Sequence, residues 1–302
     1  MKHLKSSLIF IVSLVCLTLV FLGGLFLFFK PHQELSSNFA SPQKEKRISL
    51  VAIGDSLTHG VGDTTNKGGY VYLIKKRLQK EDYQVQTANF GKTGDRSDQI
   101  QTRIEQQANI QKKLKKADVI TLTVGGNDLM KVLQDNFLLL ASNQLDSAMP
   151  KAEKKYQKSL TDLLSKIRSY NKKAPIFLFS IYNPFYVYFP QITDLQKYTN
   201  RWNQIAQNVG ESTKEVYFVD INQQLSQGQY LKQSKQKLKQ TTPVDLTKIS
   251  SDKLENILTN QEEKNNYLSS ADHFHPNLKG YKYMASQLYQ VMQANKDKWQ
   301  KE

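Results

Sequence analysis

The sequence predicts an α/β fold in which helices cover both faces of a parallel sheet. Short apolar runs of strand length alternate with longer amphipathic stretches along most of the chain. This alternation is typical of sheets built from β–α–β units. Glycine and small polar residues follow several of the apolar runs, as expected where strands end in turns. The 302 residues, 39% hydrophobic and 23% charged, have the composition of a globular protein.

Five strands are predicted. The first covers residues 48–53, an apolar run that ends at Gly54 and is typical of a buried strand. The other expected strands cover residues 84–89, 119–124, 175–180 and 216–219. The expected helices cover residues 70–80, 98–114, 151–170, 192–209 and 278–293. Two stretches, 129–150 and 223–267, interrupt the alternation, and such interruptions are either lids and binding loops or disordered surface.

The N-terminal residues predict a membrane anchor. Residues 8–29 carry no charged side chain and would span about 33 Å as a helix, enough for a bilayer core. Lys2 and Lys5 before them favour a cytoplasmic N-terminus. We therefore expect a cytoplasmic segment (1–7), a single-pass transmembrane helix (8–29), a linker (30–47) and a domain on the extracellular face of the cell membrane (48–302). The alternative is a cleaved signal peptide, which exports the same domain.

The net charge of +15 predicts an attraction to anionic partners unless it is only a solvated surface. No nucleic-acid-binding motif is present, and export argues against an intracellular partner, so we expect no nucleic acid. An anionic lipid or cell-wall surface is the remaining possibility. The single cysteine, Cys16, excludes an intramolecular disulfide and a cysteine-based metal cluster.

Polar clusters follow the first three predicted strands. They are Gly54-Asp55-Ser56-Leu57, Asn89-Phe90-Gly91 and Gly125-Gly126-Asn127-Asp128. Turns favour these residue types in any protein. However, ligands of open parallel sheets bind beyond the carboxyl ends of the strands. Three such clusters at one edge of the sheet therefore predict a functional site.

The C-terminal region adds a histidine and a carboxylate. Asp272 and His275 are three residues apart, just before the last predicted helix. At that spacing an aspartate can accept the Nδ1–H of the imidazole and leave the other ring nitrogen to take a proton. A serine hydroxyl is a weak nucleophile without such a base. Ser56, His275 and Asp272 therefore form a candidate catalytic triad.

These blocks, in this order, resemble the SGNH/GDSL hydrolase family from Gly54 to about Met284. The Gly-x-Ser-x-Gly motif of α/β-hydrolases is absent. The resemblance implies a three-layer α/β/α, flavodoxin-like fold with a five-stranded parallel sheet. It also implies a serine esterase that cleaves carboxylic esters through an acyl-enzyme, with no metal or organic cofactor. Ser56 would be the nucleophile, His275 the general base and then acid, and Asp272 its orienting partner. The implied oxyanion hole consists of the backbone N–H groups of Ser56 and Gly91 and the side-chain amide of Asn127.

Several alternatives stay open. The expected substrate is an ester of either a lipid or an acylated cell-surface carbohydrate. A metal-dependent hydrolase would use Asp272, His273 and His275 as ligands, and a cell-wall-binding protein would use the scaffold without catalysis. We expect His273 to lie on the surface or behind the site, and Asp128 either to hold Asn127 or to cap the next segment. An aromatic cluster after the fourth strand predicts either core packing or a pocket wall, and it comprises Tyr182, Phe185, Tyr186, Tyr188 and Phe189.

Overall fold

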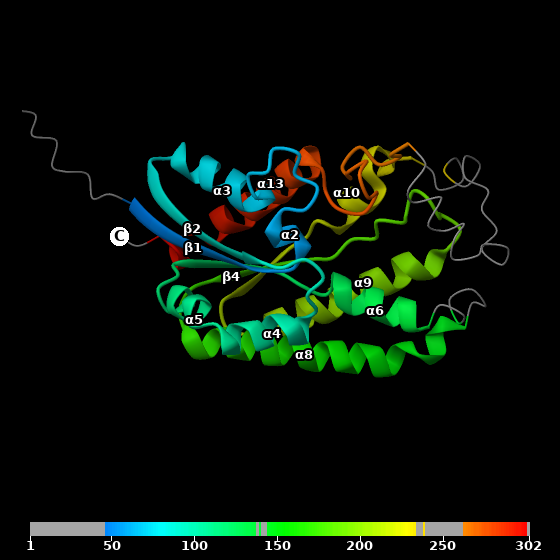
Figure 1. Ribbon diagram of the computed structural model, residues 1–302, viewed down its shortest axis with the longest axis horizontal. Helices are drawn as coiled ribbons and strands as arrows, with labels where there is room; N and C mark the ends of the chain where they lie inside the picture. The colour runs from blue at the N-terminus through cyan, green and yellow to red at the C-terminus, as the bar shows by residue number, and fades with distance from the viewer. Residues whose placement is uncertain (1–45, 137–138, 140–143, 234–237, 239–261, 301–302) are drawn as a thin grey trace, which may run out of the picture. The chain divides into compact units, whose positions relative to one another are not determined.

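The computed structural model describes residues 46–136, 139, 144–233, 238 and 262–300. Its centre is a parallel sheet of five strands in the order β2-β1-β3-β4-β5 (Figure 1). The strands are β1 (Lys46–Gly54), β2 (Tyr83–Gly91), β3 (Val119–Thr123), β4 (Ile176–Phe179) and β5 (Val216–Val219). The predicted five-stranded parallel sheet is thereby confirmed. The strand order changes direction between β1 and β3, and ligands of such sheets bind at the carboxyl ends of the strands at this point.

Burial explains the sequences of β3 and β2. All five residues of β3 are buried, because this strand has neighbours on both sides and helices on both faces. At the edge of the sheet, the first half of β2 alternates buried and exposed residues. We call the two ends of the sheet the amino edge, where the strands begin, and the carboxyl edge, where they end.

Two hydrophobic cores lie on opposite faces of the sheet. Helices α3 (Gly69–Gln79) and α13 (Leu278–Ala294) pack on one face, where Leu50 and Ala52 of β1 point. The other face, which receives Val51 and Ile53, is covered by α4 (Ser97–Gln106), α5 (Ala108–Lys115), α8 (Met149–Tyr170) and α9 (Thr193–Glu211). Residues from Glu45 onward form a compact unit of their own, and the residues of both cores all lie within it.

Short helices follow three of the strands at the carboxyl edge. They are α2 (Ser56–His59), α6 (Gly126–Asp135) and α10 (Asn222–Gln227), and 3-10 turns lie at η1 (Leu145–Ser147), η2 (Gly228–Tyr230) and η4 (Lys296–Lys298). The predicted helix at 98–114 is in fact two helices, because Gln107 has an extended backbone. The side chain of Gln111 donates to the carbonyls of Ile104 and Glu105, which satisfies the free carbonyls at this break.

The predicted membrane segment, 8–29, lies outside the described residues and stays a prediction. Within the described ranges, no helix combines the length and the apolar character needed to cross a bilayer. The first strand begins at Lys46, two residues before the predicted start of the domain.

Candidate active site

The turn after β1 places Ser56 at the carboxyl edge. Gly54 approaches β3 so closely that a Cβ there would lie 2.3 Å from Thr123 Oγ1. Asp55 caps α2: its Oδ1 accepts the N–H of Leu57 at 3.0 Å and the hydroxyl of Thr123 at 2.7 Å. Leu57 is buried against the core. Ser56 is therefore the first residue of a helix that is fixed on both sides.

Ser56, His275 and Asp272 form one chain of hydrogen bonds. Ser56 Oγ lies 2.9 Å from His275 Nε2, and His275 Nδ1 lies 2.6 Å from Asp272 Oδ2. The other carboxylate oxygen, Asp272 Oδ1, accepts the backbone N–H groups of Phe274 and His275, each at 3.0 Å. The structure thus brings Ser56 next to His275, which lies 219 positions later in the sequence, and its neighbour Asp272.

Two carboxylates near His275 have opposite pKa shifts. Burial is the main cause that raises the pKa of Asp55, and it outweighs the hydrogen bonds from Thr123 and Leu57. Burial would also raise the pKa of Asp272, but the hydrogen bonds from the side chain and backbone of His275 outweigh it and hold that pKa below its ordinary value. Asp272 is therefore the carboxylate that stays ionised beside the imidazole.

Two of the three predicted oxyanion donors are available. The N–H of Ser56 makes no hydrogen bond within the described part of the chain, as expected for the first N–H of a helix. Asn127 lies at the start of α6, and its Nδ2 donates to the carbonyl of Asp95 at 2.9 Å, which leaves one amide hydrogen. Both groups lie after neighbouring strands, β1 and β3, at the carboxyl edge.

The third predicted donor, the N–H of Gly91, already has a partner. It donates to Asn89 Oδ1 at 2.9 Å, and Asn89 Nδ2 donates to the carbonyl of Thr58. A Cβ at Gly91 would lie 2.1 Å from the backbone nitrogen of His59. The glycine therefore allows β2 to pack against α2, and its N–H is not free for a ligand in this arrangement.

Gly94 is a candidate donor that sequence reasoning missed. Its φ is +84°, it is exposed, and no atom lies within 4 Å of the position a Cβ would take. No residue in the described ranges accepts its N–H. It precedes Asp95, whose carbonyl accepts from Asn127. A glycine in a short polar turn after a strand was the available signal.

A buried arginine fixes this turn. Arg103 of α4 donates from Nε to Asp95 Oδ2 at 2.9 Å, from Nη1 to the carbonyl of Phe90, and from Nη2 to the carbonyl of Gly54. It therefore joins the ends of β1 and β2 to the turn at 92–95.

Asp128 has a different role from the one expected beside Asn127. Both its oxygens accept the backbone N–H of Ser97, the first residue of α4, and one accepts the Ser97 hydroxyl at 2.5 Å. Asp128 thus caps a neighbouring helix rather than holding Asn127.

His273 lies behind the site. Its side chain is buried, and Nδ1 is 2.7 Å from Glu263 Oε2 and 3.0 Å from the hydroxyl of Tyr188.

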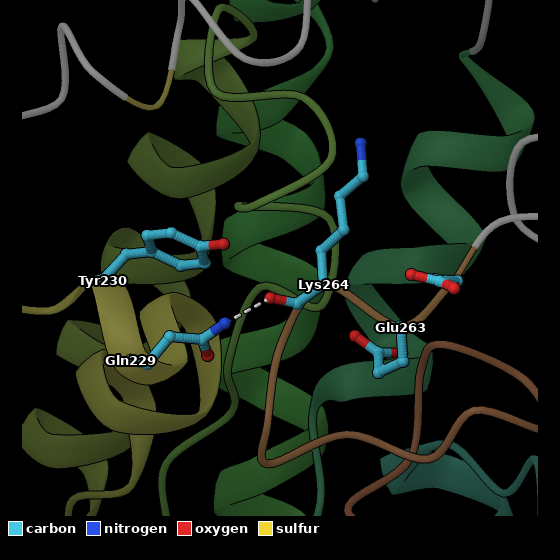
Figure 2. A pocket seen from close by; sticks show the side chains of 5 residues that line it. Gln229, Tyr230, Glu263 and Lys264 are labelled. Atoms are coloured by element: carbon cyan, nitrogen blue, oxygen red, sulfur yellow. Dashed lines mark hydrogen bonds between the residues drawn. The ribbon is translucent and has the colours of Figure 1, made fainter.

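Glu263 also lines a surface hollow of about 570 Å³, together with Gln229, Tyr230, Glu262 and Lys264. In this hollow the side chain of Gln229 donates to the carbonyl of Lys264 (Figure 2). Among the described residues, no group of three or more histidine, cysteine, aspartate or glutamate side chains is arranged to hold a metal ion.

The aromatic cluster after β4 divides into two parts. Tyr182, Tyr186, Tyr188 and Phe189 are buried packing residues. Phe185 is half-buried, and its ring makes an edge contact with Phe274 at 6.0 Å between centroids. The ring of Phe274 lies 5.1 Å from that of His275. These two phenylalanines therefore supply apolar surface next to the candidate base.

Comparison with known proteins agrees with this geometry. A match to the GDSL-like lipase/acylhydrolase family covers residues 52–283. The chain is 31% identical over 251 residues to the uncharacterised protein YpmR of Bacillus subtilis, and the aligned region covers 82% of each chain. It is 28% identical over 178 residues to the spore germination lipase LipC of Bacillus licheniformis, which covers 57% of this chain and 79% of LipC.

A solved structure extends the comparison to the fold. The lipase Lip_vut3 from a goat rumen metagenome aligns with a TM-score of 0.57 and 25% identity, over 81% of this chain and 97% of the lipase. The family match supports ester hydrolysis as the general class of activity. Because that match covers most of the chain and includes the segments that hold Ser56, Asn127, Asp272 and His275, this protein belongs to the GDSL-like lipase/acylhydrolase family.

Proposed function

We propose that this protein is a serine esterase that hydrolyses carboxylic esters through an acyl-enzyme at Ser56. The observation that carries the proposal is the unbroken hydrogen-bond chain from Ser56 Oγ through His275 to Asp272. Such a chain makes the serine hydroxyl a nucleophile, because the imidazole takes its proton as it attacks.

The reaction follows from these contacts. Ser56 Oγ attacks the ester carbonyl while His275 Nε2 takes the hydroxyl proton, and Asp272 stabilises the resulting imidazolium. His275 then protonates the leaving alkoxide as the acyl-enzyme forms. In the second half, His275 removes a proton from water, the hydroxide attacks the acyl group, and Ser56 recovers its proton from His275. No step requires a metal or an organic cofactor.

The developing oxyanion needs hydrogen-bond donors. We assign this role to the N–H of Ser56, the side-chain amide of Asn127 and the N–H of Gly94. Gly94 replaces Gly91 in this assignment, because Asn89 occupies the Gly91 N–H. Loss of one such donor typically lowers kcat by about 10²–10³-fold. The apolar surface formed by Phe185 and Phe274 is the proposed contact for the acyl group.

The proposed substrate is a lipid or an acylated carbohydrate at the cell surface, and the proposed location is the outer face of the membrane. The uncharged run at 8–29 and the two lysines before it support this placement.

The test is an assay of the full chain, in mild detergent, on p-nitrophenyl acetate, butyrate and octanoate. We expect turnover that Ser56→Ala and His275→Gln abolish, that His273→Gln largely retains, and that EDTA does not change. Loss of activity with EDTA would support the metal-dependent alternative. Absence of turnover by the native chain on every ester would support a binding protein.

A further inference from the structure

Lysines gather at the amino edge of the sheet, on the side opposite the candidate active site. Five of them surround one surface hollow of about 530 Å³, and we call them the basic face: Lys115, Lys116, Lys172, Lys173 and Lys298. They lie at the end of α5, on the turns that precede β3 and β4, and on η4 near the C-terminus. Arg47, at the start of β1, lines an adjoining hollow that shares Asp118 with the first.

The two carboxylates beside this hollow leave most of its charge unneutralised. Asp118 Oδ2 accepts the backbone N–H of Ser49 at 2.9 Å, and Asp297 pairs with Lys298 at 3.0 Å. The other four lysines are exposed, and none forms an ion pair with a carboxylate in the described ranges. The basic face therefore carries a net positive charge.

The turns that carry these lysines are fixed to each other. Asn171 Nδ2 donates to the carbonyls of Leu114 and Ala117, which joins the turn before β4 to the turn before β3. Arg168 Nη1 donates to the carbonyl of Ala174 at 2.7 Å. Because these contacts are buried or half-buried, the lysines project from a rigid edge, and their arrangement is already formed before a partner binds.

Two segments of the carboxyl edge have the opposite charge balance. The segments 55–69 and 262–275, which hold Ser56 and His275, contain Asp55, Asp63, Glu262, Glu263 and Asp272 but only Lys67 and Lys264 as basic residues other than histidine. An anionic surface would therefore attract the amino edge more strongly than these two segments.

We propose that the basic face binds the anionic headgroups of a phospholipid bilayer and orients the domain with its active site away from that bilayer. The chain enters the domain at this same edge, because β1 begins at Lys46, and the uncharged run at 8–29 precedes it by a short polar segment. The membrane anchoring proposed above is used only to select a bilayer among anionic partners. The binding itself requires neither the anchor nor catalysis.

The experiment measures co-sedimentation of the 45–302 unit with vesicles, so that the N-terminal apolar run does not contribute. The vesicles are phosphatidylcholine alone or phosphatidylcholine with 30% phosphatidylglycerol. We expect binding to the anionic vesicles only, and loss of that binding as salt rises from 50 to 500 mM. Because each lysine at an anionic membrane contributes about five-fold to affinity, replacing Lys115, Lys116, Lys172 and Lys173 by Gln should weaken binding about 100-fold or more.

A matched variant controls for net charge. It replaces four exposed lysines elsewhere, Lys151, Lys154, Lys155 and Lys282, by Gln. This variant should bind almost as the parent does, and Ser56→Ala should bind equally well, which separates the proposal from the esterase activity. Equal weakening by both quadruple variants would reduce the effect to net charge and overturn the proposal. The proposal would also be overturned if the variant of the basic face kept its binding to vesicles but lost binding to soluble polyphosphate. That result would indicate an anionic polymer as the partner.

A second measurement tests the orientation. The 45–302 unit lacks the only cysteine of the chain, Cys16, so single cysteines can carry a fluorophore. A label at Lys173→Cys should be quenched by a lipid-borne quencher in anionic vesicles, whereas a label at Thr64→Cys, in the loop after α2, should not. Quenching at position 64 would contradict the proposed orientation.

Discussion

Asp55 and Asp272 are both aspartates near His275, and their hydrogen bonds give them different properties. Asp272 receives three N–H groups, including two from the backbone, which favours its ionised form. Asp55 is more deeply buried, so burial outweighs its hydrogen bonds and raises its pKa. Asp55, which caps the helix of Ser56, and Asp272, which accepts from His275, therefore respond differently to amide substitution and to pH.

Asp272→Asn should lower kcat by about 10⁴-fold while leaving the fold intact. Oδ1 accepts two backbone N–H groups, so the amide oxygen will keep that position and the NH₂ group will face His275 Nδ1. The imidazole must then carry its proton on Nε2, where it cannot accept one from Ser56. Steady-state kinetics on p-nitrophenyl butyrate, with circular dichroism as the control for folding, checks this. A loss below ten-fold would mean that Asp272 does not set the tautomer.

Asp55→Asn should stabilise the protein at neutral pH and flatten its stability–pH curve. An aspartate whose folded pKa is raised above its unfolded value of 3.8 makes stability fall as pH rises through that interval, because the folded state binds the proton more tightly. Asparagine removes this loss, and its side-chain oxygen can still accept from Leu57 and Thr123. Thermal unfolding from pH 4 to pH 8 measures the difference. A lower melting temperature for the variant across the whole range would show that the carboxylate itself is needed.

The turn at 92–95 is the element whose shape matters most for the site. It follows the last residue of β2, and Arg103 holds it to the ends of both neighbouring strands. The sequence predicted β2 and the polar residues after it, but not this arrangement. A helical arginine is in general exposed, and only the long-range backbone contacts show that this one is buried.

Arg103→Met should destabilise the fold by about 3–5 kcal/mol, because it removes the buried partner of Asp95 and of two carbonyls and leaves that carboxylate only the exposed Lys92, at 3.8 Å. Chemical denaturation measures this loss. The double variant Arg103→Met with Asp95→Asn should recover part of it, since the unpaired buried charge is gone. If the two substitutions prove additive, the ion pair is not the reason for the loss.

Gly91→Ala and Gly94→Ala should separate packing from catalysis. The Gly91 variant places a Cβ against backbone atoms of α2, so we expect a loss of stability of about 1–3 kcal/mol or more. The Gly94 variant meets no atom but keeps a positive φ, so about 1 kcal/mol is expected from backbone strain alone. Melting temperatures and kcat values of both variants show whether each glycine is needed for packing or for catalysis. A Gly94→Ala enzyme with unchanged kcat would argue that this turn does not approach the reacting ester.

At the scale of the whole molecule, the sequence was sufficient for the sheet and for the grouping of the polar residues. Strand-length apolar runs and the clusters after them depend on local patterns, and the rule for open sheets then places those clusters at one edge. The contact between Asn89 and Thr58 and the contact between Arg103 and Gly54, which fix the segment around Gly91 and Gly94, join distant segments. No local pattern encodes such contacts.

Removal of residues 1–44 should leave the domain folded and active. Both hydrophobic cores consist of residues from Ile48 onward. The 45–302 unit should therefore match the full chain in detergent, within a few degrees of melting temperature and within two-fold in kcat/KM on a soluble ester. A much lower melting temperature or kcat/KM for the 45–302 unit would mean that the N-terminal segment has a structural role.

The nine residues of β1 run without interruption from the amino edge to the turn that holds Ser56. At about 3.3 Å per residue, the strand places its last residue, Gly54, roughly 26 Å from the point where the chain enters the domain, and Ser56 follows two residues later. This separation is set by a hydrogen-bonded strand and not by a loop. If the amino edge rests on a bilayer, the acyl groups of that bilayer lie out of reach. Ester groups on molecules that extend well above the headgroups would then be the accessible ones.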